Sequence, residues 1–330
     1  MEINKLSNAT QKSMKTRIIT GLILAAIAIP GVILGDWFFL VFVLLLVGVG
    51  LWEVLRGTGK KYPWPVFVLM YIFTFSFVFW TFFQKANPVQ DSVANYNPET
   101  GHFLMYDIRI STMGVGFLFA SLFFVSIWSE KVNINDVFYL FGMSLFLGFS
   151  TQAILFLRFC PTALASEEFA YPNYLSNCLL LFYVLAGALL NDICAYFVGI
   201  LFGKHKMNPR VSPKKTWEGF FGGVILSSTI TAGFALICDG AFNTPLLDGV
   251  LDTERWYFIV LVSLSMSLAS VLGDLMFSLI KRHYGIKDFG SIFPGHGGVL
   301  DRFDSVLMTA MLASIVIAFV YYQPLMGAIA

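Results

Sequence analysis

The sequence predicts an all-α fold: a polytopic transmembrane helical bundle of about nine spans. Hydrophobic residues make up 57% of the 330 residues and charged residues only 12%, whereas a soluble domain carries about a quarter charged residues. The apolar residues fall into runs of roughly 20, the length of helix that crosses a bilayer core of about 30 Å. Basic residues are concentrated in alternate loops, as expected for a chain that crosses a membrane repeatedly.

The individual spans follow from these runs. We expect them at about 18–35, 37–55, 63–83, 110–128, 137–157, 178–202, 220–238, 256–279 and 303–323. The first two runs are nearly continuous, so Gly35-Asp36 should form a tight turn between two helices. Pro30 and Gly48 inside spans are compatible with helix, because neighbouring helices can satisfy the freed backbone groups.

The basic residues predict the orientation. Nine spans divide the loops into two alternating sets, and 17 of the 21 Lys and Arg residues fall in one set. The other set holds Lys85, Arg109, Arg158 and Arg255. Because cytoplasmic loops are enriched in Lys and Arg, we expect a cytoplasmic N-terminus. Basic catalytic loops would add to the same tally for other reasons.

The chain divides into two regions by its polar content. Residues 1–170 contain about five spans and few polar motifs, whereas residues 171–330 contain three polar clusters, all at or near the predicted cytoplasmic side. We therefore expect the catalytic region in 171–330. The four cysteines, Cys160, Cys178, Cys194 and Cys238, form no CxxC pair, which excludes an obvious disulfide framework or zinc site.

The first polar cluster is Asn191-Asp192, inside the sixth predicted span. Asp192 lies about ten residues from the cytoplasmic end of that span, or roughly 15 Å at 1.5 Å per residue. A carboxylate at that depth is costly unless it is paired, solvated or bound to a cation. The alternative is a helix–helix hydrogen bond from a paired or protonated acid.

The second cluster follows that span: Gly203-Lys204, then Ser212-Pro213-Lys214-Lys215-Thr216-Trp217-Glu218-Gly219, then Gly222-Gly223. Lysines beside small residues and free backbone amides suit phosphate oxygens. An inside-positive loop followed by a small-residue helix interface would explain the same residues.

The third cluster carries the densest set of charges: Gly273-Asp274, Ser278, Lys281-Arg282, Lys287-Asp288, Pro294-Gly295-His296-Gly297-Gly298, Asp301-Arg302 and Asp304. Asp274 and Ser278 are four apart and should share a helix face. Asp301 and Asp304 are three apart at the start of the ninth span. Favourable placement of acids at a helix N-terminus would explain those two alone, but not Asp274 at membrane depth.

Carboxylates surrounded by Lys and Arg indicate a divalent cation together with phosphates. Mg²⁺ prefers oxygen ligands and is usually held by one or two carboxylates and substrate phosphates. Phosphoryl-type transfer depends mainly on positioning and charge neutralisation.

The 27 residues from Ser278 to Asp304, SLIKRHYGIKDFGSIFPGHGGVLDRFD, closely resemble the signature of phosphatidate cytidylyltransferases, or CDP-diacylglycerol synthases. The Asn-Asp…Ala-Tyr, Gly-Lys and Ser-Pro-Lys-Lys-Thr…Glu-Gly elements resemble the same family, so the resemblance covers roughly 178–323. It implies attack of a phosphatidic acid phosphate oxygen on the α-phosphorus of CTP, with release of pyrophosphate. It also implies Mg²⁺, with K⁺ as a candidate second cation.

The resemblance implies roles for particular residues. The catalytic set would be Asp274, Asp301, Asp304, Lys281 and Arg302. The metal-binding set would be Asp274 and Asp301, assisted by Ser278 and Asp304. The substrate-binding set would be Lys204, Ser212, Lys214, Lys215, Thr216, Arg282, Lys287, His296 and Asp192. His296 would either bind phosphate or hydrogen-bond its own loop.

Three alternatives remain at this point. A related CTP-dependent transferase could act on another lipid phosphate or alcohol, an ion-coupled transporter would also use intramembrane acids, and a structural scaffold would not need them. The partners expected are CTP, phosphatidic acid and the lipid bilayer, with a homodimer as a candidate assembly and no nucleic acid. The expected location is a bacterial plasma membrane with the active site facing the cytoplasm.

Overall fold

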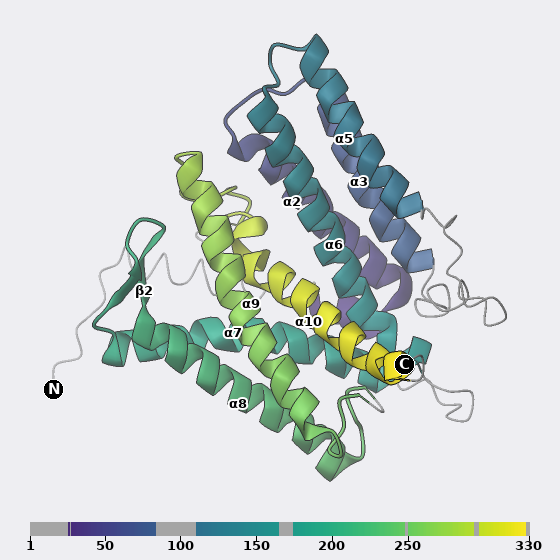
Figure 1. Cartoon of the computed structure of the whole chain (residues 1–330), viewed down its shortest axis with the longest axis vertical. Helices are drawn as coiled ribbons and strands as arrows, with labels where there is room; N and C mark the ends of the chain where they lie inside the picture. The colour runs from purple at the N-terminus through teal and green to yellow at the C-terminus, as the bar shows by residue number, and fades with distance from the viewer. Residues whose placement is uncertain are drawn as a thin grey trace.

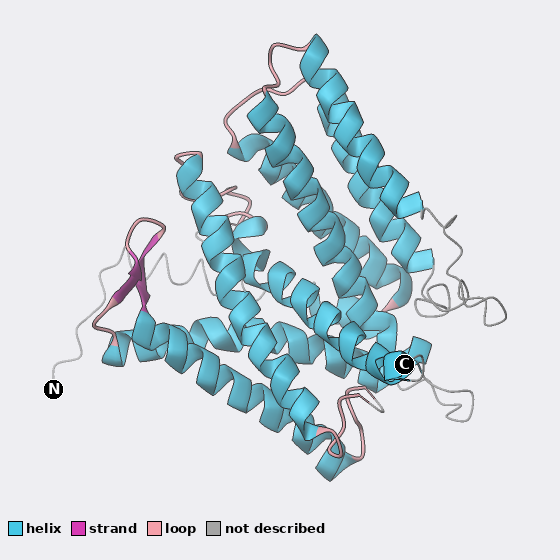
Figure 2. Cartoon of the chain, viewed as in Figure 1, coloured by secondary structure: helices cyan, strands magenta, loops and turns pink. Residues whose placement is uncertain are grey.

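The structure, a computed structural model, describes residues 26, 28–83, 110–164, 174–247, 250–293 and 297–327. A helix at 28–34 precedes α2 (Asp36–Gly57), α3 (Trp64–Phe83), α5 (Ile110–Trp128), α6 (Ile134–Leu164) and α7 (Tyr174–Phe202). Two short strands, β1 (Lys206–Asn208) and β2 (Ser212–Thr216), then lead into α8 (Trp217–Phe242), α9 (Trp256–His283) and α10 (Leu300–Gly327). The predicted all-α class is confirmed, apart from this small hairpin (Figure 2).

The helices form two groups that meet at α10 and where α6 packs on α7. Helices α2, α3, α5 and α6 pack on one another in one group, and α7, α8 and α9 form the other. Helix α10 contacts α6 of the first group and α7 and α9 of the second, and Figure 1 shows it between them. The first turn of α10 therefore lies where both groups can contribute side chains.

Seven helices of the described part are long and apolar enough to cross a membrane, whereas the sequence predicted nine spans. The fourth predicted span corresponds to α5, of which only the shorter apolar stretch Gly114–Trp128 is described fully. Half of the first predicted span, residues 18–25 and 27 of 18–35, lies outside the described residues. The other seven coincide with helices, and six of these extend beyond a predicted end, whereas α3 lies within the predicted 63–83.

Local chemistry explains the turns at the helix ends. Gly35 has a φ of 66°, a left-handed conformation that glycine adopts readily, and it forms the predicted tight turn before α2. Antiparallel pairing of Lys206 with Thr216 forms the hairpin between α7 and α8. Thr216 then caps α8, since its hydroxyl accepts a hydrogen bond from the Gly219 N–H at 3.2 Å.

Glycines allow the helices that carry the polar clusters to approach closely. A Cβ at Gly223 would lie 2.7 Å from the Ala195 Cβ, so α8 packs tightly against α7. This confirms a small-residue interface at Gly222-Gly223. A Cβ at Gly273 would lie 2.6 Å from the Asp304 carbonyl oxygen, so the same close contact brings α9 against the first turns of α10.

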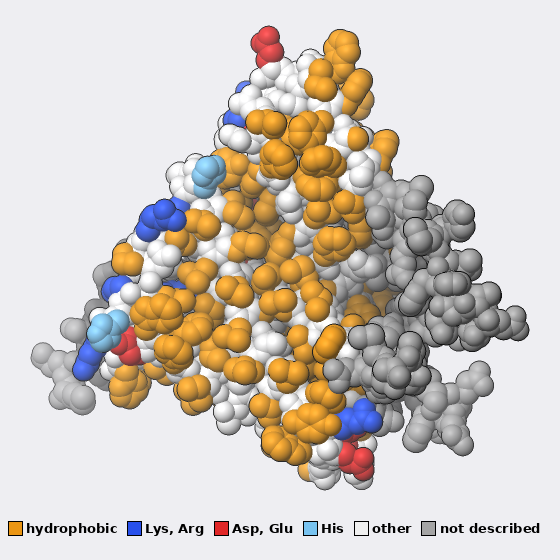
Figure 3. Space-filling model, in the orientation of Figure 1, with side chains coloured by type: hydrophobic (Ala, Val, Ile, Leu, Met, Phe, Trp, Pro, Cys, Tyr) orange, Lys and Arg blue, Asp and Glu red, His pale blue; other side chains and the backbone are white. Residues whose placement is uncertain are grey.

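The surface of the bundle is that of a membrane protein. Figure 3 shows a face covered by hydrophobic side chains, with charged side chains confined to its edges. The α2–α3 turn, the α5–α6 turn, the C-terminal end of α9 and the β1–β2 hairpin lie along one side, at the upper left of Figure 1, and the α8–α9 loop lies opposite. This is the separation that the alternating basic loops predicted.

Candidate functional site

Three carboxylates from three different helices lie close together. Asp192 comes from α7, Asp274 from α9 and Asp304 from the first turns of α10. Each of them interacts electrostatically with the other two. The Ser305 hydroxyl donates to Asp192 Oδ2 at 3.3 Å, and the Ser305 N–H donates to Asp304 Oδ1 at 2.8 Å. These helices correspond to the sixth, eighth and ninth predicted spans. We call Asp192, Asp274 and Asp304 the carboxylate cluster.

Lys215 brings a positive charge to this cluster. Its Nζ lies 2.6 Å from Asp274 Oδ2, and both side chains are partly accessible. Ser278 donates to the other oxygen of Asp274 at 3.2 Å, so the predicted shared helix face of these two residues is confirmed. The hairpin thereby connects the second polar cluster of the sequence to the third. Asp192 is exposed, Asp274 is half-buried and Asp304 is buried. The cluster is therefore accessible from the side of Asp192.

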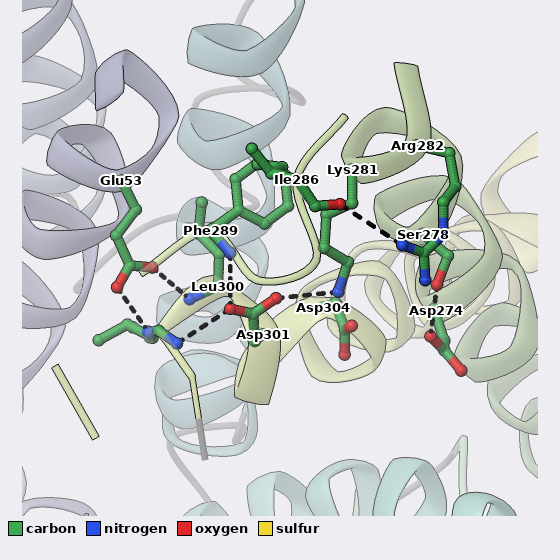
Figure 4. A network of polar contacts seen from close by, with 12 residues as sticks. Glu53, Asp274, Ser278, Lys281, Arg282, Ile286, Phe289, Leu300, Asp301 and Asp304 are labelled. Atoms are coloured by element: carbon green, nitrogen blue, oxygen red, sulfur yellow. Dashed lines mark hydrogen bonds and ion pairs between the residues drawn. The ribbon is translucent and has the colours of Figure 1, made fainter. Parts of the chain in front are cut away.

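Asp301 has different neighbours from the other acids. Its Oδ1 accepts from Lys281 Nζ at 2.9 Å, and its Oδ2 accepts from the backbone N–H groups of Phe289 at 2.8 Å and Gly298 at 2.9 Å (Figure 4). The side chain is 2% exposed. Both Asp301 oxygens thus contact Lys281 and backbone amides in this structure, and the expectation that Asp301 joins Asp274 at one metal stays a prediction. Placement at a helix N-terminus accounts for Asp301, because its oxygens stabilise backbone amides and one lysine.

Glu53 of α2 is a residue that the sequence analysis missed. It is 2% exposed, and its two oxygens accept from the N–H groups of Val299 and Leu300 at 2.8 Å each (Figure 4). A signal was present, since an acid inside an apolar span is by default a candidate functional residue. The first region of the chain, which looked free of polar motifs, thus contributes directly to the start of α10.

The remaining predicted residues of the hairpin lie in different settings. Lys204 at the end of α7 and Lys214 on β2 are exposed, and Ser212 is half-buried. Thr216 is buried, and its hydroxyl caps α8, so a substrate contact by Thr216 is not what its geometry supports. Beside them, His205 Nδ1 lies 2.6 Å from Glu218 Oε1 and closes the hairpin onto the start of α8.

The predicted basic residues after α9 also differ in position. Lys281 is buried between Asp301 and the Phe289 ring, and it also interacts with Asp304. Arg302 is exposed and interacts electrostatically with Asp192. Arg282 and Lys287 are exposed, and Arg282 reaches the Ile286 carbonyl oxygen at 3.5 Å.

The glycine-rich segment forms the predicted turn. Phe293 and Gly297 face each other across it, with the Phe293 N–H 2.9 Å from the Gly297 carbonyl oxygen. Gly297 has a φ of 84°, a conformation that favours glycine. His296 lies outside the described residues, so the choice between its two roles stays open.

The cluster has the chemistry of an oxygen-only cation site. Within the described ranges, no three His, Cys, Asp or Glu side chains form a group that could hold a metal ion by themselves. Mg²⁺ commonly uses one or two carboxylates and completes its shell with waters and phosphates. One or two of Asp192, Asp274 and Asp304 would meet that requirement, and three like charges gathered on apolar helices favour a compensating cation.

Comparison with known proteins shows which family and which proteins the sequence is similar to. The sequence matches the family described as "Cytidylyltransferase family" over residues 15–320. It is 31% identical over 302 residues to a phosphatidate cytidylyltransferase of Bacillus subtilis, covering 89% of this chain and 94% of that protein. It is 43% identical over 128 residues to one of Staphylococcus epidermidis, and 42% over 132 residues to one of Mycobacterium leprae. Those two matches span 39% and 40% of this chain, and only 45% and 38% of the relatives.

Proposed function

Because the chain belongs to the cytidylyltransferase family, we propose that it transfers the cytidylyl group of CTP to phosphatidic acid, forming CDP-diacylglycerol and pyrophosphate. The structural observation that carries this proposal is the carboxylate cluster of Asp192, Asp274 and Asp304, beside Lys215. A site of this kind can gather two phosphate groups at a cation, which is the requirement of the reaction.

Each part of the site has a task in the proposed reaction. Asp274 and Asp304 would hold Mg²⁺, with Asp192 beside them as a further candidate ligand. Asp301 keeps its predicted role as a metal ligand, and K⁺ is a candidate second cation. A bound Mg²⁺ would neutralise phosphate charge and make the α-phosphorus a better electrophile. Lys214 and Lys215 on the hairpin would hold phosphate oxygens, and so would Arg302, which interacts electrostatically with Asp192.

No covalent nucleophile is needed. The phosphate of phosphatidic acid is anionic at neutral pH and attacks the α-phosphorus directly, while the bond to pyrophosphate breaks. The protein contributes alignment of the two phosphates and compensation of their charge. Lys281 would act on this step through Asp304 and Asp301, since it interacts with both.

The location of the cluster suits substrates from two phases. CTP is a soluble polyanion, and phosphatidic acid stays in the leaflet. The exposed Asp192 is followed on α7 by the exposed aromatic residues Tyr196 and Phe197, which would border the route of the lipid. We infer that the basic loops face the cytoplasm, because Lys and Arg are enriched on that side of membrane proteins. With bacterial relatives, a bacterial plasma membrane is the proposed location.

The test is direct. Detergent-purified protein is incubated with labelled CTP, phosphatidic acid and Mg²⁺, and labelled CDP-diacylglycerol is the expected product. Parallel reactions replace phosphatidic acid with diacylglycerol or an isoprenoid phosphate. Product from one of these and none from phosphatidic acid would favour the related transferase, whereas no CTP consumption with any lipid would contradict both and leave the transporter.

A further inference from the structure

One buried acid, Glu53, has no part in the proposed reaction, yet it contacts the backbone that leads into α10. Glu53 lies in the last turns of α2, and its carboxylate accepts from Val299 N–H and Leu300 N–H, 246 and 247 residues away in the sequence. These are the first amides of α10, and the first N–H groups of a helix have no partner within the helix. A side chain of the same segment usually caps them; here the cap comes from another region of the chain.

The segment that precedes α10 is held between two carboxylates. Glu53 binds the amides at 299 and 300, and Asp301 binds those at 289 and 298. Asp301 is balanced by Lys281 at 2.9 Å. Within the described part of the chain no Lys, Arg or His forms an ion pair with Glu53, so its charge is stabilised by the amide dipoles at the start of α10. In Figure 4 the two acids approach the segment from opposite sides.

The close approach of Glu53 requires glycine at two positions of the segment. A Cβ on Gly298 or on Gly290 would overlap the Glu53 carboxylate. From the other direction, a Cβ on Gly57, one turn after Glu53, would lie 3.0 Å from the Phe289 ring. The end of α2 is therefore in close contact with the segment at several points, and any shift of the Glu53 carboxylate has to move the backbone around 298–300.

We propose that Glu53 is a positioning residue, through which the N-terminal region sets the first turn of α10 and with it Asp304 and Arg302. This inference rests on the proposed function, because Asp304 and Arg302 belong to the carboxylate cluster and its surroundings. Glu53 touches neither substrate nor cation; it acts through the backbone at Val299 and Leu300. The proposal gives the N-terminal helices a part in the reaction besides anchoring.

The first experiment replaces Glu53 with Gln, which preserves shape but turns an NH₂ group toward one of the two amides. Turnover at saturating substrate should fall by about tenfold to a hundredfold, because small displacements of aligned groups have large effects. The KM for CTP should change by less than about threefold, since no substrate contact is lost. Tyr71→Phe is the matched control: it removes the 2.8 Å hydrogen bond to the α2 carbonyl of Gly48 without touching the segment, and should retain wild-type turnover.

Hydrogen–deuterium exchange gives a measurement that needs no activity. In Glu53→Gln the amides of Val299 and Leu300 should exchange about tenfold faster or more, and in Tyr71→Phe they should not. Unchanged exchange and unchanged turnover in Glu53→Gln would overturn the proposal. If the wild-type protein makes no CDP-diacylglycerol, the proposed function fails, and the exchange result alone still decides whether Glu53 orders this segment.

Gly298→Ala, which leaves Glu53 in place, is the second variant where Glu53→Gln does not fold, and a double-mutant cycle relates the two positions. Gly298→Ala alone should reduce turnover, because its methyl group meets the Glu53 carboxylate. In a Glu53→Ala background, which removes that carboxylate, Gly298→Ala should have little further effect. Effects that simply multiply would show that the two sites act independently and would contradict the proposal.

Discussion

The Nζ atom of Lys215 on β2 lies 2.6 Å from Oδ2 of Asp274 on α9. This ion pair ties the β1–β2 hairpin to the helix that carries the third polar cluster of the sequence. It places a cation among three acids before any substrate binds. When a substrate phosphate arrives, the same ammonium group can be shared with it, so the pair connects phosphate binding to the state of the carboxylate cluster.

Asp274 should be essential for turnover. Asp274→Asn keeps the shape of the side chain and removes its charge, and we expect turnover to fall by about a hundredfold or more. Asp239→Asn is the control: Asp239 accepts from Thr253 at 2.6 Å near the opposite end of the bundle, and its replacement should leave turnover near wild type. A folded Asp274→Asn protein with normal activity would remove Asp274 from the site.

Lys215 should contribute to kcat/KM through its position, and not only through the positive charge that it adds to the hairpin. Lys215→Gln removes the cation that pairs with Asp274 and the proposed contact to a substrate phosphate. Loss of a charge-assisted hydrogen bond costs about 1.5–3 kcal/mol. We therefore expect kcat/KM to fall by about one to two powers of ten. Lys206→Gln on β1 removes an equal charge from the same hairpin, and Lys206 is exposed. Equal, small effects of the two changes would instead favour a purely topological role for the loop.

Asp301 should act on stability as well as activity. Asp301→Asn leaves Lys281 buried without its acid and weakens the bonds to the amides at 289 and 298. Removing one partner of a buried ion pair costs about 3–5 kcal/mol, so the melting temperature of the substrate-free protein should fall. Asp274→Asn, which relieves repulsion in the carboxylate cluster, should not lower it. Equal melting temperatures for wild type and Asp301→Asn would contradict this assignment.

Divalent cations should be required and should bind at the carboxylate cluster. Chelation should abolish turnover reversibly, and added Mg²⁺ should restore it. Mg²⁺ should also raise the melting temperature of the wild-type protein without substrate, because a ligand that binds only the folded state stabilises it. This second effect should be lost in the Asp274→Asn, Asp304→Asn double variant. A Mg²⁺-dependent rise that persists in that variant would place the cation elsewhere.

The basic side of the bundle should face the cytoplasm. Single cysteines introduced at Arg210 and Lys287, in a background without the native cysteines, should resist a membrane-impermeant reagent in intact cells and react after lysis. A cysteine at Thr253, in the opposite loop, should react in intact cells. Labelling of positions 210 or 287 from outside would reverse the proposed topology.

Much of the candidate site could be predicted from residue order because its parts are local. Asp274 and Ser278 share a face through the 3.6-residue period of a helix, and the 3.2 Å hydrogen bond between them follows from that spacing. The turn closed by Phe293 and Gly297 follows from the glycine at 297, whose φ of 84° other residues rarely adopt. The sequence also indicated that Asp192 and Asp274, at membrane depth, need partners or a cation.

The apolar spans, their parity and the grouping of basic loops on one side were determined by the sequence alone, because length, hydropathy and charge act residue by residue. Tertiary structure decided which groups each carboxylate contacts. Asp301 and Asp304, three residues apart, diverge because the backbone turning into α10 offers its free amides to one of them, and α9 and α7 bring acids to the other. Glu53 became part of the site only when α2 packed beside that turn. Hydrogen bonds across 246 residues depend on which helices pack together, and hydrophobic periodicity within one helix does not specify its neighbours.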